Sequence, residues 1–248
     1  RSSAASDVYK RQYNNSGHYL TFINTETLGG SKAVIQLISS ASEGGCTDVT
    51  IRNCNIKFSN SNNLYCIYAG ASALYGLIGY AIGYNHHNLS IIDNILTTAL
   101  VGIWAESGSS SYANNNLTIT GNTIGSETSA NYITKHGIWV GGINGGNISQ
   151  NTIFNLLYSS SANISGIYIT SVNSGSSLTI SKNKIFSIRN LYAGQYGAAG
   201  IDINSYVSNI NISNNVIYDV YGKGSYAGND NAVYGIRLRG NNSNVNIY

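Results

Sequence analysis

Proline and methionine are absent from this chain of 248 residues, and charged residues make up only 9% of it. Residues 1–12 resemble the translation of a sequencing adapter, so we treat them as non-native. Three of the 13 basic and one of the 10 acidic residues lie there, which leaves 10 and 9 and a net charge near +1. Without a basic patch, the composition argues against a nucleic-acid-binding surface. We expect residues 13–248 to form one domain and, since methionine is absent and the repeat stops at Tyr248, a fragment truncated at both ends.

Cysteine is scarce, since only Cys46, Cys54 and Cys66 occur. Their spacing matches no zinc-binding pattern, and their odd number leaves at least one thiol unpaired. Buried apolar side chains and a single disulfide both stay open. Residues 64–84 form an uncharged stretch long enough to raise the question of a membrane span, but its four Gly and five Tyr favour two strands and a turn.

Asparagine, glycine and tyrosine dominate what is present, with 35, 28 and 20 copies. Hydrophobic residues make up 42% of the chain, and isoleucine recurs at regular spacing, which indicates a packed core rather than disorder. A surface of Asn, Ser, Gly and Tyr with few charges is typical of exported bacterial proteins. The composition therefore predicts a secreted or cell-surface location.

One nine-residue phrase recurs along the chain, and its clearest copy is Asn116–Ile124. Six further copies, of which the last is truncated, follow the same pattern. A unit of about 30 residues predicts a solenoid, in which each repeat buries its apolar side only against its neighbours. The central isoleucines lie at intervals of 40, 28, 29, 32, 32 and 35 residues and are Ile51, Ile91, Ile119, Ile148, Ile180, Ile212 and Ile247.

Within the phrase, apolar residues alternate as in Leu117 and Ile119, which is the period of a strand with one buried face. Three residues after the central isoleucine stands an Asn, replaced by Cys54 in the first copy. Asn tolerates the left-handed backbone of a bend, and its amide can donate to and accept from the copies above and below. We predict an internal ladder formed by Asn94, Asn122, Asn151, Asn183 and Asn215.

A second motif, Gly-Ile-x-apolar, recurs at intervals of 35, 29, 34 and 35 residues and tracks the first. Together with a short strand after the ladder Asn, the two motifs predict three short strands in each coil. Parallel strands of neighbouring coils lie about 4.8 Å apart, so about seven coils make a rod roughly 34 Å long. The clear copies begin at Gly102, Gly137, Gly166, Gly200 and Gly235, and weaker ones lie at Ala33–Leu37 and Gly76–Gly79.

The ladder Asn and the Gly-Ile strand resemble those of right-handed parallel β-helix repeat proteins of the pectate-lyase-like group, over about residues 19–248. The resemblance implies an all-β, right-handed parallel β-helix solenoid with about seven coils of three strands. It implies no single activity, because this scaffold carries lyases, hydrolases, tailspikes, adhesins and stalks. A leucine-rich repeat is the alternative for the phrase alone, but segments such as 158–163 are poor helix formers and that fold leaves the Gly-Ile strand unexplained.

The x position of the Gly-Ile strand is expected to point outward, because its two apolar neighbours point inward. Flat aromatic faces on a rigid sheet can bind sugar rings, and at about 1 kcal/mol per ring three rings give millimolar affinity for a polysaccharide. The same rings could instead stabilise the sheet through contacts with one another, and the charged pair could be only a surface ion pair. The column contains Trp104, Trp139, Tyr168, Asp202 and Arg237.

A catalytic function requires grouped acids, whereas the acids of the repeat region are scattered. The β-helix lyases and hydrolases of the resembling group carry clustered acids, in lyases as calcium ligands, and neither pattern occurs here. Glu106 and Asp202 lie on corresponding strands about 14 Å apart, whereas glycosidase carboxylates stand roughly 5–9.5 Å apart. We therefore predict no catalytic residue, no cofactor and no metal. His86 and His87 are expected in an exposed turn, and His136 in a structural role.

The main hypothesis is an extracellular β-helix scaffold of a bacterial surface or secreted protein, adhesin-like or polysaccharide-contacting and non-catalytic in this fragment. A polysaccharide lyase or glycoside hydrolase with acids in loops or missing coils is the first alternative. A passive structural spacer is the second. The expected partner is a polysaccharide or cell-surface glycan, without nucleic acid and without a membrane span.

Overall fold

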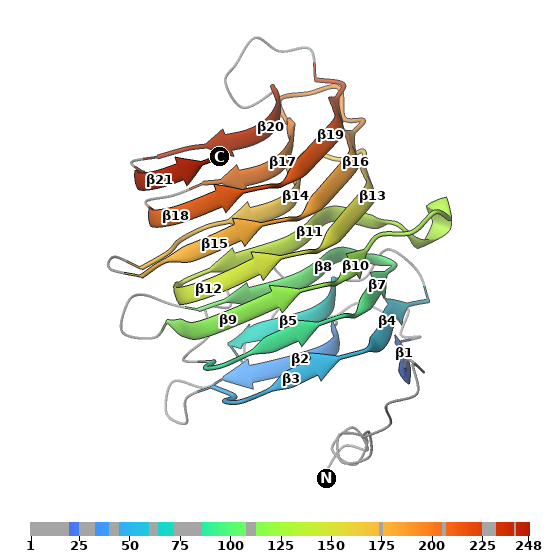
Figure 1. Ribbon diagram of the computed structural model, residues 1–248. Coiled ribbons are helices and arrows are strands. Elements are labelled where there is room, and N and C mark those ends of the chain that lie inside the picture. The colour runs from blue at the N-terminus through green and yellow to red at the C-terminus, as the bar shows by residue number, and fades with distance from the viewer. Residues whose placement is uncertain are drawn as a thin grey trace.

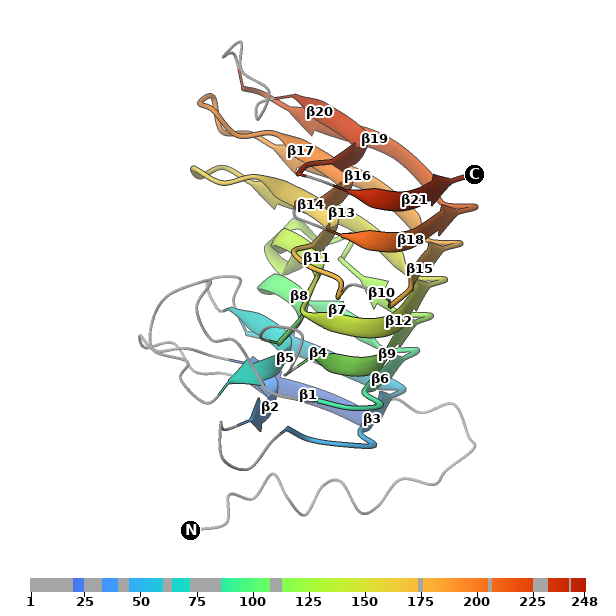
Figure 2. The same ribbon diagram turned by 90° about the vertical axis from the view of Figure 1, so that its left-hand side faces the viewer.

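The chain folds into a stack of parallel β-coils that forms a solenoid of about six turns with three strands per coil (Figures 1 and 2). Each of its three sheets holds seven parallel strands, and neighbouring strands in a sheet come from successive coils. The all-β parallel β-helix predicted from the repeats is therefore confirmed. The computed structural model describes residues 20–24, 33–39, 45–59, 64–71, 86–107, 113–173, 176–204, 207–224, 232–240 and 242–248. Residues 1–12 and the Gly76–Gly79 motif lie outside these ranges.

The strands of each sheet follow one another up the stack. Sheet A contains β1 (Leu20–Asn24), β4 (Cys54–Phe58), β7 (Ile95–Thr97), β10 (Thr123–Ile124), β13 (Thr152–Tyr158), β16 (Lys184–Asn190) and β19 (Val216–Gly222). Sheet B contains β2 (Ala33–Ser39), β5 (Tyr65–Ala71), β8 (Ala99–Glu106), β11 (Ile133–Gly141), β14 (Ile164–Ile169), β17 (Ala198–Ile203) and β20 (Val233–Leu238). Sheet C contains β3 (Thr50–Arg52), β6 (Ser90–Ile92), β9 (Asn114–Thr120), β12 (Ile143–Ser149), β15 (Leu178–Ser181), β18 (Ser208–Ser213) and β21 (Ser243–Ile247). A 3₁₀ helix covers Ser129–Asn131.

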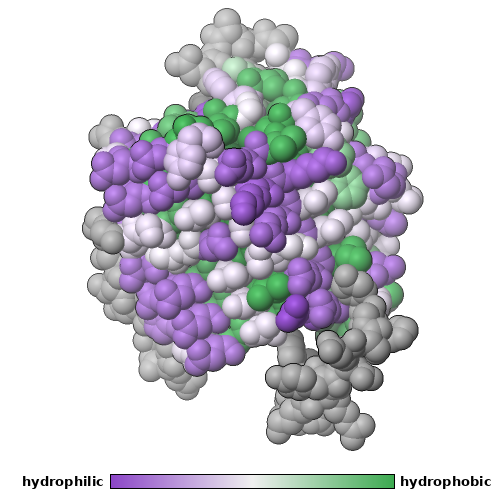
Figure 3. Space-filling view, viewed as in Figure 1, coloured by the Kyte–Doolittle hydropathy of each residue, from purple (hydrophilic) through white to green (hydrophobic). Residues whose placement is uncertain are grey.

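The core runs along the axis of the stack and is filled by residues that alternate along the strands of sheet C, whereas in sheets A and B some core residues stand three apart, as Ile153 and Leu156 of β13 do. Leu117 and Ile119 of β9 are 1% and 0% exposed, while Thr118 between them is half-buried on the outside. The outer face of sheet C carries short hydroxyl and amide side chains, and hydrophilic and intermediate residues cover most of the view in Figure 3. Alternation with a period of two therefore sets the inside and the outside of sheet C.

The predicted asparagine ladder is present inside the stack. In each rung, the backbone N–H and the Nδ2 group of one Asn donate to the Oδ1 of the Asn in the next coil. The N···O distances are 3.0 and 2.9 Å from Asn122 to Asn151, and both are 3.0 Å from Asn151 to Asn183. Nδ2 of Asn151 also donates to the carbonyl of Ile119 at 2.9 Å. The same bonds join Asn94 to Asn122 and Asn183 to Asn215.

The left-handed residue of each bend precedes the ladder Asn, so the prediction of a left-handed ladder Asn is wrong. Gln150 and Lys182 each have a φ of 57°, and Gly121 has a φ of 69°. The side chains of Gln150 and Lys182 are exposed, so the residues with the left-handed backbone contribute no side chain to the interior of the stack. The amide of the ladder Asn, in contrast, must reach two neighbouring coils, and its own backbone N–H must point along the stack.

A second row of cross-coil bonds lies at the start of sheet C. Nδ1 of His86 accepts the backbone N–H of Cys46 at 3.1 Å, and the backbone N–H of His86 donates to Oδ1 of Asn114 at 3.0 Å. His86 is 0% exposed, so the prediction of an exposed turn is wrong for this residue. Burial lowers the pKa of His86, which keeps the acceptor nitrogen free of a proton.

The three cysteines form no disulfide. Cys54 and Cys66 are buried and Cys46 is half-buried, each as a free thiol. Cys54 takes the ladder position of the first copy, where its backbone N–H donates to Oδ1 of Asn94 at 2.9 Å. Of the two alternatives, the small buried side chain is therefore the correct one for Cys54 and Cys66. In the part of the chain that the structure describes, no helix is long and apolar enough to cross a membrane.

Candidate functional site

The five residues predicted to share a column do share it, on the outer side of sheet B. Trp104 of β8 pairs with Trp139 of β11, which pairs with Tyr168 of β14. Tyr168 pairs with Asp202 of β17, which pairs with Arg237 of β20. None of them belongs to the apolar core inside the coils, so the predicted register and direction agree with the structure.

The exposure of this column differs from the prediction. Trp104 and Asp202 are each 1% exposed and Arg237 is 5% exposed, so these three do not form an open platform. Trp139 and Tyr168 are half-buried. The coils lie only about 4.8 Å apart, so large rings on neighbouring coils must pack against one another. Trp104 and Trp139 stack with ring centroids 4.0 Å apart, and each indole thereby covers one face of the other.

The aromatic contacts continue below and above the tryptophan pair. Tyr65 of β5 packs edge-on against Trp104 at 5.3 Å and lies 5.2 Å from Tyr68. Trp139 meets Tyr168 edge-on at 4.5 Å. Burial, with a smaller effect of the Glu106 charge, raises the pKa of Tyr65 to about 12, so its phenol stays protonated at neutral pH. Each aromatic ring pair of this kind stabilises the fold by about 0.5–1.5 kcal/mol in addition to the effect of the buried apolar area.

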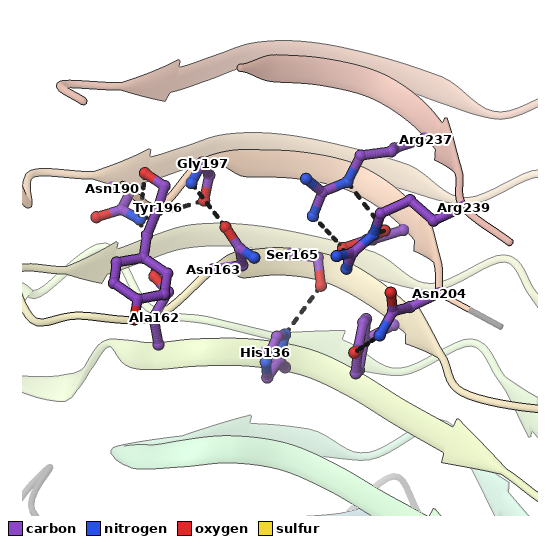
Figure 4. A network of polar contacts seen from close by, with 12 residues as sticks. His136, Ala162, Asn163, Ser165, Asn190, Tyr196, Gly197, Asn204, Arg237 and Arg239 are labelled. Atoms are coloured by element: carbon purple, nitrogen blue, oxygen red, sulfur yellow. Dashed lines mark hydrogen bonds and ion pairs between the residues drawn. The ribbon is translucent and has the colours of Figure 1, made fainter. Parts of the chain in front are cut away.

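His136 lies inside this aromatic cluster. It is 3% exposed, and its ring lies 5.0 Å from both Trp139 and Tyr168. Its Nδ1 lies 2.8 Å from Oγ of Ser165 (Figure 4). Burial, and then the nearby charge of Lys135, hold the pKa of His136 well below its usual value. Because Ser165 is 0% exposed, this Ser–His pair cannot reach a substrate and supports a structural role.

Two arginines enclose the carboxylate of Asp202. Arg237 donates to it from Nε at 3.1 Å and from Nη2 at 2.5 Å. Arg239 donates at 3.3 and 2.9 Å (Figure 4). Asn204 beside them donates from Nδ2 to the Tyr168 hydroxyl at 2.5 Å. The predicted Asp202–Arg237 pair is therefore real, but it is a buried cluster of charges rather than a surface ion pair.

Glu106, at the end of β8, is the other acid on the outer side of sheet B. Its Oε1 accepts a hydrogen bond from Thr170 Oγ1 at 2.8 Å, although these residues lie two coils apart. The bond is possible because Gly141 stands between them: a Cβ there would come within 1.9 Å of Thr170 Oγ1 and 2.9 Å of Glu106 Oε1. Burial raises the pKa of Glu106, and Thr170 and the nearby Trp139 indole partly offset this. The Trp139 N–H lies near the carboxylate without meeting the geometry of a hydrogen bond.

The two acids do not form a catalytic pair. Glu106 is on β8 and Asp202 on β17, three strand steps apart in sheet B, or about 14 Å. The carboxylates of a glycosidase stand roughly 5–9.5 Å apart. Within the described ranges, no group of three or more His, Cys, Asp or Glu side chains could hold a metal ion.

Several residues of this site were not predicted. Tyr68 pairs with Trp104 and extends the column by one coil. Its motif, Cys66-Ile67-Tyr68-Ala69, has Cys in place of Gly, and accepting any small residue there would have revealed it. Arg239 lies two residues after Arg237, so strand alternation places both on the same face. The bond from Thr170 to Glu106 requires knowledge of the intervening coil.

Sheet A carries a second aromatic column. Phe154, Phe186 and Tyr218 stack with centroids 5.3 and 5.0 Å apart and nearly parallel rings. Lys184 lies over the Phe186 ring at 5.0 Å. Tyr218 is 46% exposed, while Phe154 is 8% exposed. Cross-coil aromatic stacking is thus a general device of this stack, which weakens the argument that aromatic residues on sheet B must be there for a ligand.

Comparison with protein-family models, curated proteins and solved structures finds no match to this chain. The parallel β-helix rests on the structure itself, and membership of the pectate-lyase-like group stays a prediction.

Proposed function

We propose that this chain is a non-catalytic scaffold of a secreted or cell-surface bacterial protein, and that the outer side of sheet B contacts a polysaccharide. One observation supports the contact most directly. Residues with aromatic or hydrogen-bonding side chains stand in register along the axis, one per coil, on a rigid parallel sheet. A linear polymer suits such a row, because successive sugars can meet successive coils.

The burial of three column residues restricts which of them can touch a sugar. Trp104, Asp202 and Arg237 support the surface from below, since they are at most 5% exposed. Trp139 and Tyr168 are half-buried and offer their remaining surface. If each ring covers about 50 Å² of apolar sugar surface, each contributes about 1 kcal/mol, so retention requires a long polymer or several coils.

Affinity electrophoresis through gels that contain soluble polysaccharides tests this function. The variant Trp139→Ala with Tyr168→Ala removes both half-buried rings and leaves Trp104 in place. Its affinity for the retarding polymer should fall roughly 30-fold, since about 2 kcal/mol is lost. Phe186→Ala with Tyr218→Ala removes two rings of the sheet A column and serves as the matched control. Equal retardation of both variants, or no retardation of the parent chain by any polymer, would refute the proposal.

A passive structural spacer is the second candidate. It is favoured by the 4.0 Å stack of Trp104 on Trp139, which uses ring faces for contacts within the protein. The same experiment separates the two functions. A spacer predicts that both double variants lose stability and that neither changes the migration through any polysaccharide gel.

A further inference from the structure

Glu106 and Asp202, the two acids of sheet B, differ in whether their carboxylates can still bind a ligand. Asp202 is 1% exposed and accepts four hydrogen bonds from Arg237 and Arg239. Its charge is compensated and its oxygens are occupied. It therefore holds the column together and has no capacity to recognise a further group.

Glu106 has the opposite character. Its side chain is half-buried, and Thr170 is its hydrogen-bond donor. No ion pair within the described ranges involves it. The cation of the next strand, Lys135, lies instead over the Trp139 ring, 5.8 Å from its centroid. A carboxylate that is partly removed from water and has no cationic partner gains much from binding one.

The groups around Glu106 add two further features. Trp104 lies two residues earlier on the same face of β8, and it stacks on Trp139. The indole N–H groups of both tryptophans are buried and have no acceptor in the described part of the chain. A buried donor without an acceptor is rare and indicates that a ligand or a water completes it. Electron-rich rings beside a carboxylate are also the surroundings that favour an ammonium group.

We propose that Glu106, Thr170 and the Trp139 indole form a binding site for an amino sugar within a polysaccharide. The ammonium group pairs with the Glu106 carboxylate, and a neighbouring sugar oxygen accepts the Trp139 N–H. An amino sugar is the one monomer type that brings a cation and hydroxyl oxygens at the same time. The inference rests on the proposed polysaccharide contact and names the sugar that sheet B selects.

Binding of chitosan oligosaccharides, followed by tryptophan fluorescence, tests this site. The matched probe is the fully N-acetylated oligosaccharide of the same length, which has lost the cationic group. We expect the amine form to change the fluorescence and to bind at least fivefold more tightly than the acetylated form. Glu106→Gln keeps the shape of the side chain and should abolish that preference. Asp219→Asn removes an exposed acid on sheet A, which pairs with Arg189, and should leave the preference intact.

The outcomes distinguish this inference from the proposed function. Equal binding of the two oligosaccharides, or unchanged binding by a Glu106→Gln variant with a normal unfolding transition, overturns the amino-sugar site. If a neutral polysaccharide is still retained through Trp139 and Tyr168, the polysaccharide contact stands without it. If oligolysine binds through Glu106 while chitosan does not, the site is one for a peptide, and the inference is overturned. If no saccharide of any kind binds, both proposals fail.

Discussion

Replacement of Asn151 by alanine should sharply destabilise the stack, because this residue occupies the middle of the ladder. Its side chain makes four hydrogen bonds: two accepted from Asn122 and one donated to each of Ile119 and Asn183. Loss of Oδ1 leaves the buried backbone N–H of Asn122 without an acceptor, which costs about 1–3 kcal/mol. The other three bonds are worth about 0.5–1.5 kcal/mol each, so central values sum to about 5 kcal/mol.

Denaturant titration and thermal unfolding measure this effect. For a chain of this size, 1 kcal/mol shifts the midpoint by about 2–4 °C, so Asn151→Ala should lower it by roughly 10–20 °C. The matched control is Asn147→Ala, four residues earlier on the outer face of β12. The side chain of Asn147 makes no hydrogen bond in the described part of the chain, and its loss should change stability by about 0.5 kcal/mol at most. If the two variants unfold within 1 kcal/mol of each other, the ladder bonds of Asn151 do not stabilise the stack.

Three further predictions follow from the aromatic and polar contacts of sheet B. His136 stays neutral in the fold but takes up a proton near pH 6.5 when unfolded, so its contribution is complete above that pH and is lost as the pH falls. The loss grows as the pH falls below that of the unfolded imidazole, so denaturation at pH 5 and 7.5 should show a smaller pH dependence for His136→Gln than for the parent chain. Gly141→Ala should cost about 1–3 kcal/mol in the same assay, because the new Cβ displaces Thr170 from Glu106, and an unchanged midpoint would contradict that contact. Trp104→Ala should cost about 3–5 kcal/mol, and a cost below 1 kcal/mol would show that the tryptophan stack is not a stabilising contact.

The fold was predictable because one signal repeats in every coil. The alternation around Ile119 and the Asn three residues later depend only on neighbouring residues and on the equivalent residues one coil away. Both recur at a readable interval. The backbone of the bend was not predictable from Asn151 alone, since the preceding Gln150 takes the left-handed conformation. Asn tolerates that conformation, but the ladder position selects Asn because its amide forms hydrogen bonds to the coils on both sides.

The site was only partly predictable, because burial depends on what the next coil carries. The register of Trp104 and Trp139 followed from the Gly-Ile motif, whereas their mutual stacking removed the exposure that a lone strand would have. Asp202 could be paired with Arg237 by counting coils. The second arginine, Arg239, lies beyond the motif that was read, although strand alternation places it on the face of Arg237. The bond from Thr170 to Glu106 across a glycine belongs to a three-coil arrangement that no single repeat contains.

The ladder bonds keep their lengths of 2.9–3.0 Å although the residues they join lie 28 to 32 positions apart along the chain. The axial distance between neighbouring coils is therefore independent of the number of residues in each coil. An insertion in one loop enlarges the cross-section at that level alone and leaves the axial repeat unchanged. Loop lengths, and with them the surface of the molecule, can therefore differ from coil to coil while all coils share one asparagine ladder.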